Sequence, residues 1–227
     1  MGFFLVCIQS FTKLVFMKHI SVFIILFLVI IGCSSSSKVV QNMSEKFTSD
    51  EHSLIMSLDS TLPMRVLKIN NKKDSIVLRT KCKNVIADPN SVELKHFVNR
   101  LYRTVRDSIS MGVGIAAPQV GVLKNIIWVQ RFDKENFPFE VYLNPSIVKY
   151  TDKKQDCVEG CLSIPNRSDT TKTRAYAILM EYDKMDGTHH SEMIEAFTAV
   201  IFQHEIDHLN GILYLDHLEK EMNDAKK

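Results

Sequence analysis

The sequence predicts an α+β fold, in which a mostly antiparallel sheet packs around a central C-terminal helix that binds a metal ion. Three observations lead to this prediction. Strand-like runs are grouped in mid-chain, helix-like patterns lie toward both ends, and the second of these helices carries two histidines four residues apart. Strands and helices that are segregated along the chain in this way are typical of α+β domains.

Each element has its own signal. A first helix is expected over residues 92–109, where apolar residues recur at steps of three and four after a start signal at residues 88–91. Strands are expected at residues 126–129, 140–143 and 175–182, and a turn at residues 184–187 follows the last of them. The second helix is expected over residues 192–209, with Gly211 where a left-handed cap belongs.

Residues 1–33 resemble a bacterial lipoprotein signal segment. Met17 and Lys18 precede an apolar run at residues 20–31, and the motif Ile-Ile-Gly-Cys at residues 30–33 has the form of a lipobox, whose cysteine is acylated. Met17 is an alternative start. An uncleaved anchor is less favoured, because the run is shorter than the ~20 residues that span a bilayer. We therefore expect a lipoprotein held in the cell envelope through a lipid on Cys33, with the cytoplasm as the alternative location.

The rest of the chain divides into two parts. Residues 34–60 are polar and begin with four serines, so they are expected to form a flexible tether. Residues 61–227 are expected to form one domain, and a content of 45% apolar residues is enough for a hydrophobic core.

The net charge of +2 does not indicate a basic surface that would bind nucleic acid, so no nucleic-acid partner is expected. Three cysteines in the domain exclude a complete disulfide framework, although a Cys82–Cys157 pair stays open.

The strongest chemical motif is His-Glu-Ile-Asp-His at residues 204–208. Histidines four apart lie on one face of a helix, so both imidazoles can meet one metal ion, and Glu205 between them can take a proton from water. Chance histidines on a surface helix are the plain alternative. A metalloprotease is another, and it would need Asp216 or His217 as a third ligand.

Two further motifs precede this helix. Glu-Gly-Cys-Leu-Ser at residues 159–163 contains Cys161, which is either a metal ligand or a buried core residue. The segment at residues 112–119, Gly-Val-Gly-Ile-Ala-Ala-Pro-Gln, keeps its side chains short, so its backbone can approach a ligand closely. A phosphate-binding loop is disfavoured there because no Gly-Lys-Ser or Gly-Lys-Thr follows.

Together, the three motifs and their order resemble the peptide deformylase family, over about residues 62–218. The resemblance implies hydrolysis of the N-formyl group from N-formylmethionyl peptides. It implies that Cys161, His204 and His208 bind one divalent metal ion, with ferrous iron (Fe2+) expected and Zn2+ or Ni2+ as substitutes. It implies that Glu205 is the proton carrier, while the Gln119 side chain and the Leu162 backbone N–H stabilise the oxyanion.

Substrate contacts are expected from two segments. Gly112, Val113 and Gly114 would pair with the peptide backbone, whereas Phe197, Val200 and Ile201 would contact the methionine side chain; plain core packing is the alternative for this stripe. An ion pair between Glu159 and Arg174 is also expected, with two exposed charges as the alternative.

Two features depart from the family pattern. Ala196 stands where relatives usually have glycine, and residues 166–173 are unusually polar. These departures leave the catalytic residues unchanged and concern only the substrate preference.

The partners expected are N-formylated peptides, and the chain is expected to be a monomer. A non-catalytic peptide-binding lipoprotein that keeps its metal site is the alternative function.

Overall fold

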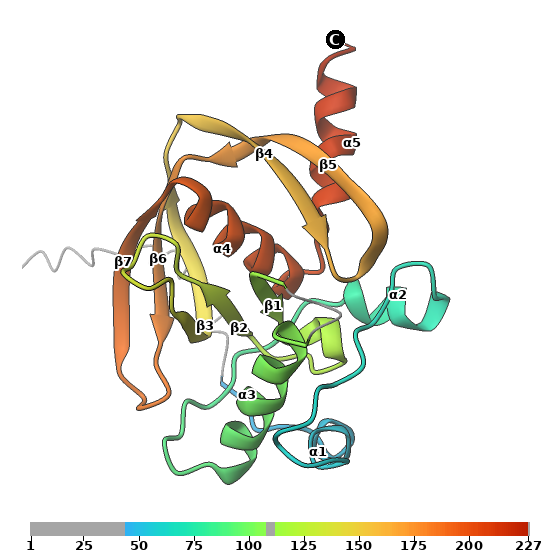
Figure 1. The fold of residues 1–227 in the computed structure, drawn as a ribbon, viewed down its shortest axis with the longest axis vertical. Coiled ribbons are helices and arrows are strands. Elements are labelled where there is room, and N and C mark those ends of the chain that lie inside the picture. The colour runs from blue at the N-terminus through green and yellow to red at the C-terminus, as the bar shows by residue number, and fades with distance from the viewer. Residues whose placement is uncertain (1–43, 108–111, 227) are drawn as a thin grey trace, which may run out of the picture. The chain divides into compact units, whose positions relative to one another are not determined.

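The computed structural model describes residues 44–107 and 112–226. The signal segment, the lipobox and the first part of the expected tether therefore lie outside the described residues. Figure 1 shows a curved sheet with one helix lying against it and a long hairpin on the other side of that helix. None of the helices in the described ranges is long and apolar enough to cross a membrane.

The main sheet has five antiparallel strands in the order β1-β2-β3-β6-β7. Their bounds are Gly114–Ala116, Ile126–Gln130, Phe139–Tyr150, Ala177–Asp183 and His189–Glu195. A separate two-stranded hairpin consists of β4 (Lys154–Cys161) and β5 (Ile164–Ala175). The predicted α+β class with its antiparallel sheet is confirmed.

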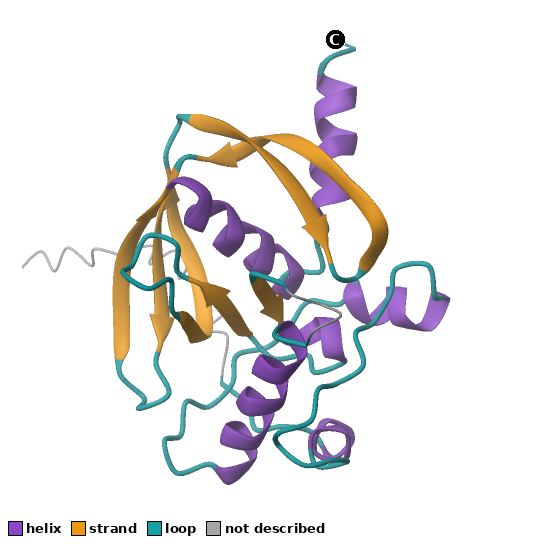
Figure 2. Ribbon diagram, in the orientation of Figure 1, coloured by secondary structure: helices purple, strands orange, loops and turns teal. Residues whose placement is uncertain are grey.

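Five α-helices accompany the strands within the described residues (Figure 2). They are α1 (Ser49–Ile55), α2 (Lys72–Leu78), α3 (Val92–Val105), α4 (Ala196–Leu209) and α5 (Tyr214–Asp224), and a short 3-10 helix, η1, spans Ala117–Val120. The helix expected over residues 92–109 is α3; it ends at Val105, and residues 108–111 are not described. Gly211 has a φ of 72°, as expected for a left-handed cap after α4.

The sheet is covered on both faces around β1 and β2, where successive side chains point to opposite sides and pack into two separate clusters. In β2, Ile127 and Val129 pack on one face with Phe202 of α4. Ile126 packs on the other face with Leu101 of α3. This sandwich holds α4 firmly between the sheet and the β4–β5 hairpin, which is the place where the motif histidines lie.

The structure differs from the sequence prediction at residues 44–60, which were expected to belong to a flexible tether. This stretch contains α1, whose capping box joins Thr48 and Glu51. The Glu51 carboxylate also accepts the Leu123 N–H at 2.9 Å, and Ile55 is fully buried. Because one buried side chain and one carboxylate hold the segment to the domain, the domain begins before residue 61.

The second helix also begins later than predicted. Residues 192–195 belong to β7, where they pair with β6, and α4 begins at Ala196. Ala196 has a φ of 54°, a left-handed conformation that a glycine adopts without the clash of a Cβ. The chain therefore turns sharply from strand into helix at this residue, so the helical pattern could not extend back to residue 192.

Candidate metal centre

Two elements bring the three expected ligands together. His204 and His208 lie one turn apart on α4, with ring centroids 5.0 Å apart. Cys161 is the last residue of β4, and its Sγ lies 3.2 Å from Nε2 of His208. One ligand atom from each of the three residues lies within 4.8 Å of the others. Residues from separate parts of the sequence thus converge on a single point.

A buried charged network fixes the orientation of His204. Its Nδ1 lies 2.7 Å from Oε2 of Glu159, and the Arg174 guanidinium donates two hydrogen bonds of 2.8 Å to the same carboxylate. Burial would raise the pKa of Glu159, but His204 and Arg174 hold the pKa well below its usual range. The expected ion pair of Glu159 and Arg174 is confirmed as a buried one, and it leaves Nε2 of His204 for the centre.

The donor set suits a metal ion. Burial would raise the pKa of the Cys161 thiol, but His208 and His204 lower the pKa well below its ordinary value, so the thiolate is favoured. Thiolate and imidazole are ligands for Zn2+, Fe2+ and Ni2+. Oε2 of Glu205 is buried and has no hydrogen-bond partner among the described residues. A buried carboxylate oxygen with nothing to bind points to a group that the site is built to receive.

Glu205 is the residue best placed for proton transfer. Burial raises the pKa of Glu205 to about 7, and the charges of His204 and His208 oppose this rise only in part. Gly114 of β1 lies so close to its carboxylate that an added Cβ would fall 2.4 Å from Oε1. Gly114 therefore allows the backbone of β1 to run directly beside the carboxylate.

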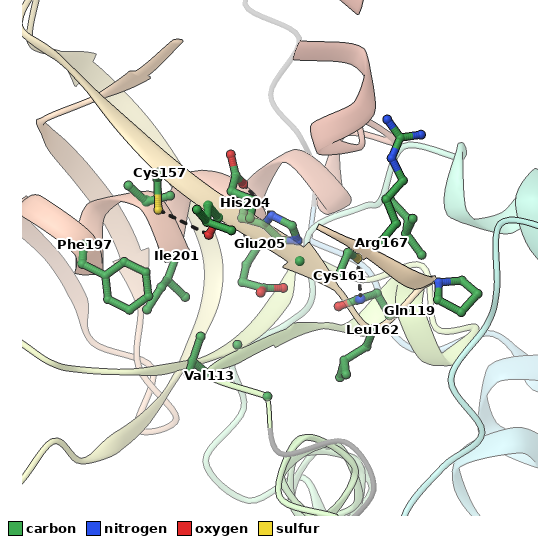
Figure 3. Close-up of a pocket in the computed structure, with 18 of the residues that line it drawn as sticks. Val113, Gln119, Cys157, Cys161, Leu162, Arg167, Phe197, Ile201, His204 and Glu205 are labelled. Carbon is green, nitrogen blue, oxygen red and sulfur yellow. Dashed lines mark hydrogen bonds and ion pairs between the residues drawn. The ribbon is translucent and has the colours of Figure 1, made fainter. Parts of the chain in front are cut away.

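The cavity around these groups has a volume of about 480 Å³. One end is apolar, as Figure 3 shows: Phe197, Ile201 and Val113 lie together beside Glu205. Val200 also lines the cavity, with only 3% of its surface exposed. The expected methionine-contacting stripe thus faces the cavity, although Val200 and Ile201 are packed as core residues too.

The other end of the cavity is polar. Nε2 of Gln119 donates to Ser163 Oγ at 3.2 Å and lies 3.6 Å from Cys161 Sγ, while Oε1 accepts the Ala116 N–H. Gln119 and Leu162 lie side by side next to Cys161 in Figure 3. Gly112, the remaining expected contact, also lines the cavity.

Other expected groups lie elsewhere. Asp216 binds Arg79, and His217 lies 2.8 Å from Asp207, so neither approaches the three ligands as the protease alternative requires. The open Cys82–Cys157 pairing is not formed, because both cysteines are free: Cys82 is buried and Cys157 lines the cavity.

Sequence reasoning missed several residues of the cavity. Lys68, Cys157, Asn166 and Arg167 all line it. The only signal was indirect, since residues 166–173 are unusually polar for this family. Polarity alone does not say which side chains reach a cavity that α4, β1 and the hairpin close together.

Comparison with known proteins decides the family. A family model described as Polypeptide deformylase matches residues 63–224, a range that includes all three motifs. The chain belongs to the peptide deformylase family. Membership in this family makes the protein a metal-dependent hydrolase, as the cysteine and histidine cluster had indicated.

Individual peptide deformylases are also similar to this chain in sequence and in structure. The chain is 34% identical to one from Leptospira biflexa over 163 residues, covering 68% of this chain and 87% of that protein. It is 36% identical to peptide deformylase 1 of Clostridium perfringens, covering 69% of this chain and 99% of that protein. The structure resembles the crystal structure of a class I type b peptide deformylase from Acinetobacter baumannii with Met-Ala-Ser bound, with a TM-score of 0.60 at 29% identity, over 69% and 99% of the two chains.

Proposed function

We propose that this chain removes the formyl group from N-formylmethionyl peptides at one divalent metal ion held by Cys161, His204 and His208. The observation that carries the proposal is the convergence of these three ligand atoms beside the unpartnered carboxylate oxygen of Glu205. Three protein ligands leave a position open, which is typical of catalytic sites. When bound, the ion would polarise the formyl carbonyl and make water more acidic. Ferrous iron is the ion we expect.

Glu205 would carry the proton. Its carboxylate takes a proton from the attacking water and passes it to the amine nitrogen as the bond from the formyl carbon to nitrogen breaks. The products are formate and a peptide with a free amino group. Burial raises the pKa of this carboxylate above its ordinary value, which favours its role as the proton acceptor.

The oxyanion would be stabilised at the polar end of the cavity. Nε2 of Gln119 and the backbone N–H of Leu162 lie beside Cys161, so both can donate to the formyl oxygen as its negative charge grows. Oε1 of Gln119 is held by the Ala116 N–H at 2.9 Å, which fixes the amide with its nitrogen toward Cys161. The N–H that points to Cys161 Sγ would turn to the formyl oxygen, while the other stays on Ser163 Oγ.

The substrate would lie along β1 with its first side chain in the apolar end of the cavity. Val113, Phe197, Val200 and Ile201 form a wall that fits a methionine side chain. The backbone at residues 112–114 would pair with the peptide as an added strand. The Acinetobacter baumannii relative is known with Met-Ala-Ser bound, and we assign a product of that kind to this cavity.

The test is turnover of formyl-Met-Ala-Ser by the full chain, purified in detergent without air and loaded with Fe2+. We expect release of formate, with formyl-Asp-Ala-Ser hydrolysed at least tenfold less efficiently because a carboxylate would be desolvated against the apolar wall. Absence of turnover by the fully metal-loaded protein would reject the proposal. Equal rates for the two peptides would reject the assignment of the methionine pocket.

We also propose that the chain is exported and anchored through a lipid on Cys33. The proposal is supported by the lipobox at residues 30–33 and by the polar segment that follows it. Radiolabelled palmitate should be incorporated into the wild type in bacterial cells and not into Cys33→Ala. Unlabelled wild-type protein in the soluble fraction would instead favour the cytoplasm.

A further inference from the structure

Lys68 brings a positive charge to the polar end of the cavity. It lies in the loop before α2, half-buried, and it lines the cavity. Its Nζ donates to the Leu162 carbonyl at 2.5 Å. The flanking residues hold this loop in place: the Leu67 N–H donates to the Gln119 carbonyl at 2.8 Å, and the Ile69 N–H donates to the Ser163 carbonyl at 2.9 Å.

The charge of Lys68 has no protein counter-ion in the described ranges. No carboxylate there lies within 4.0 Å of its Nζ, and the Leu162 carbonyl accepts only one of its three N–H groups. The other cation of the cavity, Arg167, differs in this respect, because its guanidinium is paired with Asp169 at 2.7 Å. Lys68 is thus the cation of the cavity that is left for a ligand.

The position of Lys68 says which part of a substrate it faces. Its Nζ lies at the Leu162 carbonyl, and Figure 3 shows Phe197 and Ile201 on the other side of Glu205 from Leu162. Lys68 donates to the carbonyl of Leu162, and the N–H of the same residue is the group proposed to bind the formyl oxygen. It therefore lies on the side of the formyl group, and the peptide lies on the other side of the ligand cluster.

We propose that the ammonium of Lys68 binds the carboxylate product, formate, and holds it as the amine departs. This proposal rests on the function proposed above. The reacting formyl amide is neutral, whereas formate carries a full negative charge, so Lys68 interacts more strongly with the product than with the substrate. Lys68 should therefore affect formate affinity more than KM for the peptide.

The test compares four variants of the full chain, each loaded with zinc. Lys68→Gln keeps a hydrogen-bond donor but removes the charge, Lys68→Met removes both, and Lys68→Arg keeps the charge. Lys73→Gln removes an exposed lysine nearby and serves as the matched control. The probe is 13C-labelled formate at constant ionic strength, its dissociation constant being measured by NMR line broadening with and without zinc.

We expect the dissociation constant for formate to rise about tenfold in Lys68→Gln and Lys68→Met, and to stay within about twofold of wild type in Lys68→Arg and Lys73→Gln. The inhibition constant of formate should change in parallel, with KM for formyl-Met-Ala-Ser nearly constant. Unchanged formate binding in Lys68→Gln would overturn the proposal and leave Lys68 as a support for the Leu162 turn. Because binding is measured without turnover, an inactive wild type would count against the proposed function and not against this one.

Discussion

Replacing Gly114 with alanine tests how closely β1 and the catalytic carboxylate are fitted together. An added Cβ would lie 2.4 Å from Oε1 of Glu205 and 2.9 Å from Cγ2 of Ile201. Ordinary contacts begin at 3.4 Å, so the carboxylate must move by about 1 Å. Since Glu205 is buried against Gly114, it has little room to move without leaving its position at the centre.

The size of the effect follows from this displacement. A misplacement of about 1 Å at a catalytic group costs roughly 100-fold in rate, or about 2.7 kcal/mol of transition-state stabilisation. We therefore expect Gly114→Ala to lower kcat/KM about 100-fold. Metal content should be unchanged, because the three atoms nearest to the new methyl group belong to Glu205 and Ile201 and not to a metal ligand.

Gly160→Ala provides the matched control. Gly160 also lines the cavity, but its added Cβ would meet Ser168 Cβ at 3.8 Å, an ordinary contact. Both variants would be assayed with formyl-Met-Ala-Ser and compared by metal analysis and thermal melting. If Gly114→Ala were as active as Gly160→Ala, the reasoning about this contact would be refuted.

Three further predictions concern stability. Arg174→Met leaves the buried Glu159 carboxylate without its main partner, so it should lower the free energy of unfolding by about 3–5 kcal/mol in urea titrations of the zinc-loaded protein; a loss below about 1 kcal/mol would contradict the network. Ala196→Gly relieves a left-handed alanine and should raise the free energy of unfolding by about 1 kcal/mol, whereas a decrease would show that the strain is absent. The hydrogen bonds from Arg65 lower the pKa of Asp74 to about 2, so the stability that this carboxylate contributes is present above pH 4 and is lost as the pH falls toward 2. The difference in Tm between wild type and Asp74→Asn should therefore shrink over that interval, and a constant difference would argue against the pair.

The sequence predicted the elements that have strong local signals. The α3 pattern, the strands at residues 126–129 and 140–143 and the left-handed Gly211 were all recognisable, because each depends on neighbours within a few positions. The helix of the motif histidines was recognised for the same reason. Its start was placed too early because Ala196 adopts a left-handed conformation, and an alanine in the sequence does not indicate such a turn as a glycine would.

Other features depend on contacts between distant residues. In the β4–β5 hairpin, β5 was missed because it lacks the alternation of a strand with one buried face: residues 165–168 are exposed in succession. The burial of β4 does alternate, but its less exposed positions include the polar Gln155 and Glu159, so no apolar pattern marks the strand. The helix α1 was missed because only two of its residues, Glu51 and Ile55, are buried, and the Glu51 carboxylate accepts a backbone N–H 72 residues away. Lys68 reaches the cavity through a carbonyl 94 residues away, which no local pattern can indicate.

The most direct test of the account is to measure metal content and turnover on the same preparations of wild type and Glu205→Ala. The account places Glu205 beside the ligands and not among them, so both proteins should bind one metal ion per chain. Turnover of formyl-Met-Ala-Ser should fall at least 1000-fold in Glu205→Ala, because the proton carrier is lost. A variant that retained turnover, or that failed to bind the metal, would contradict the role given to Glu205.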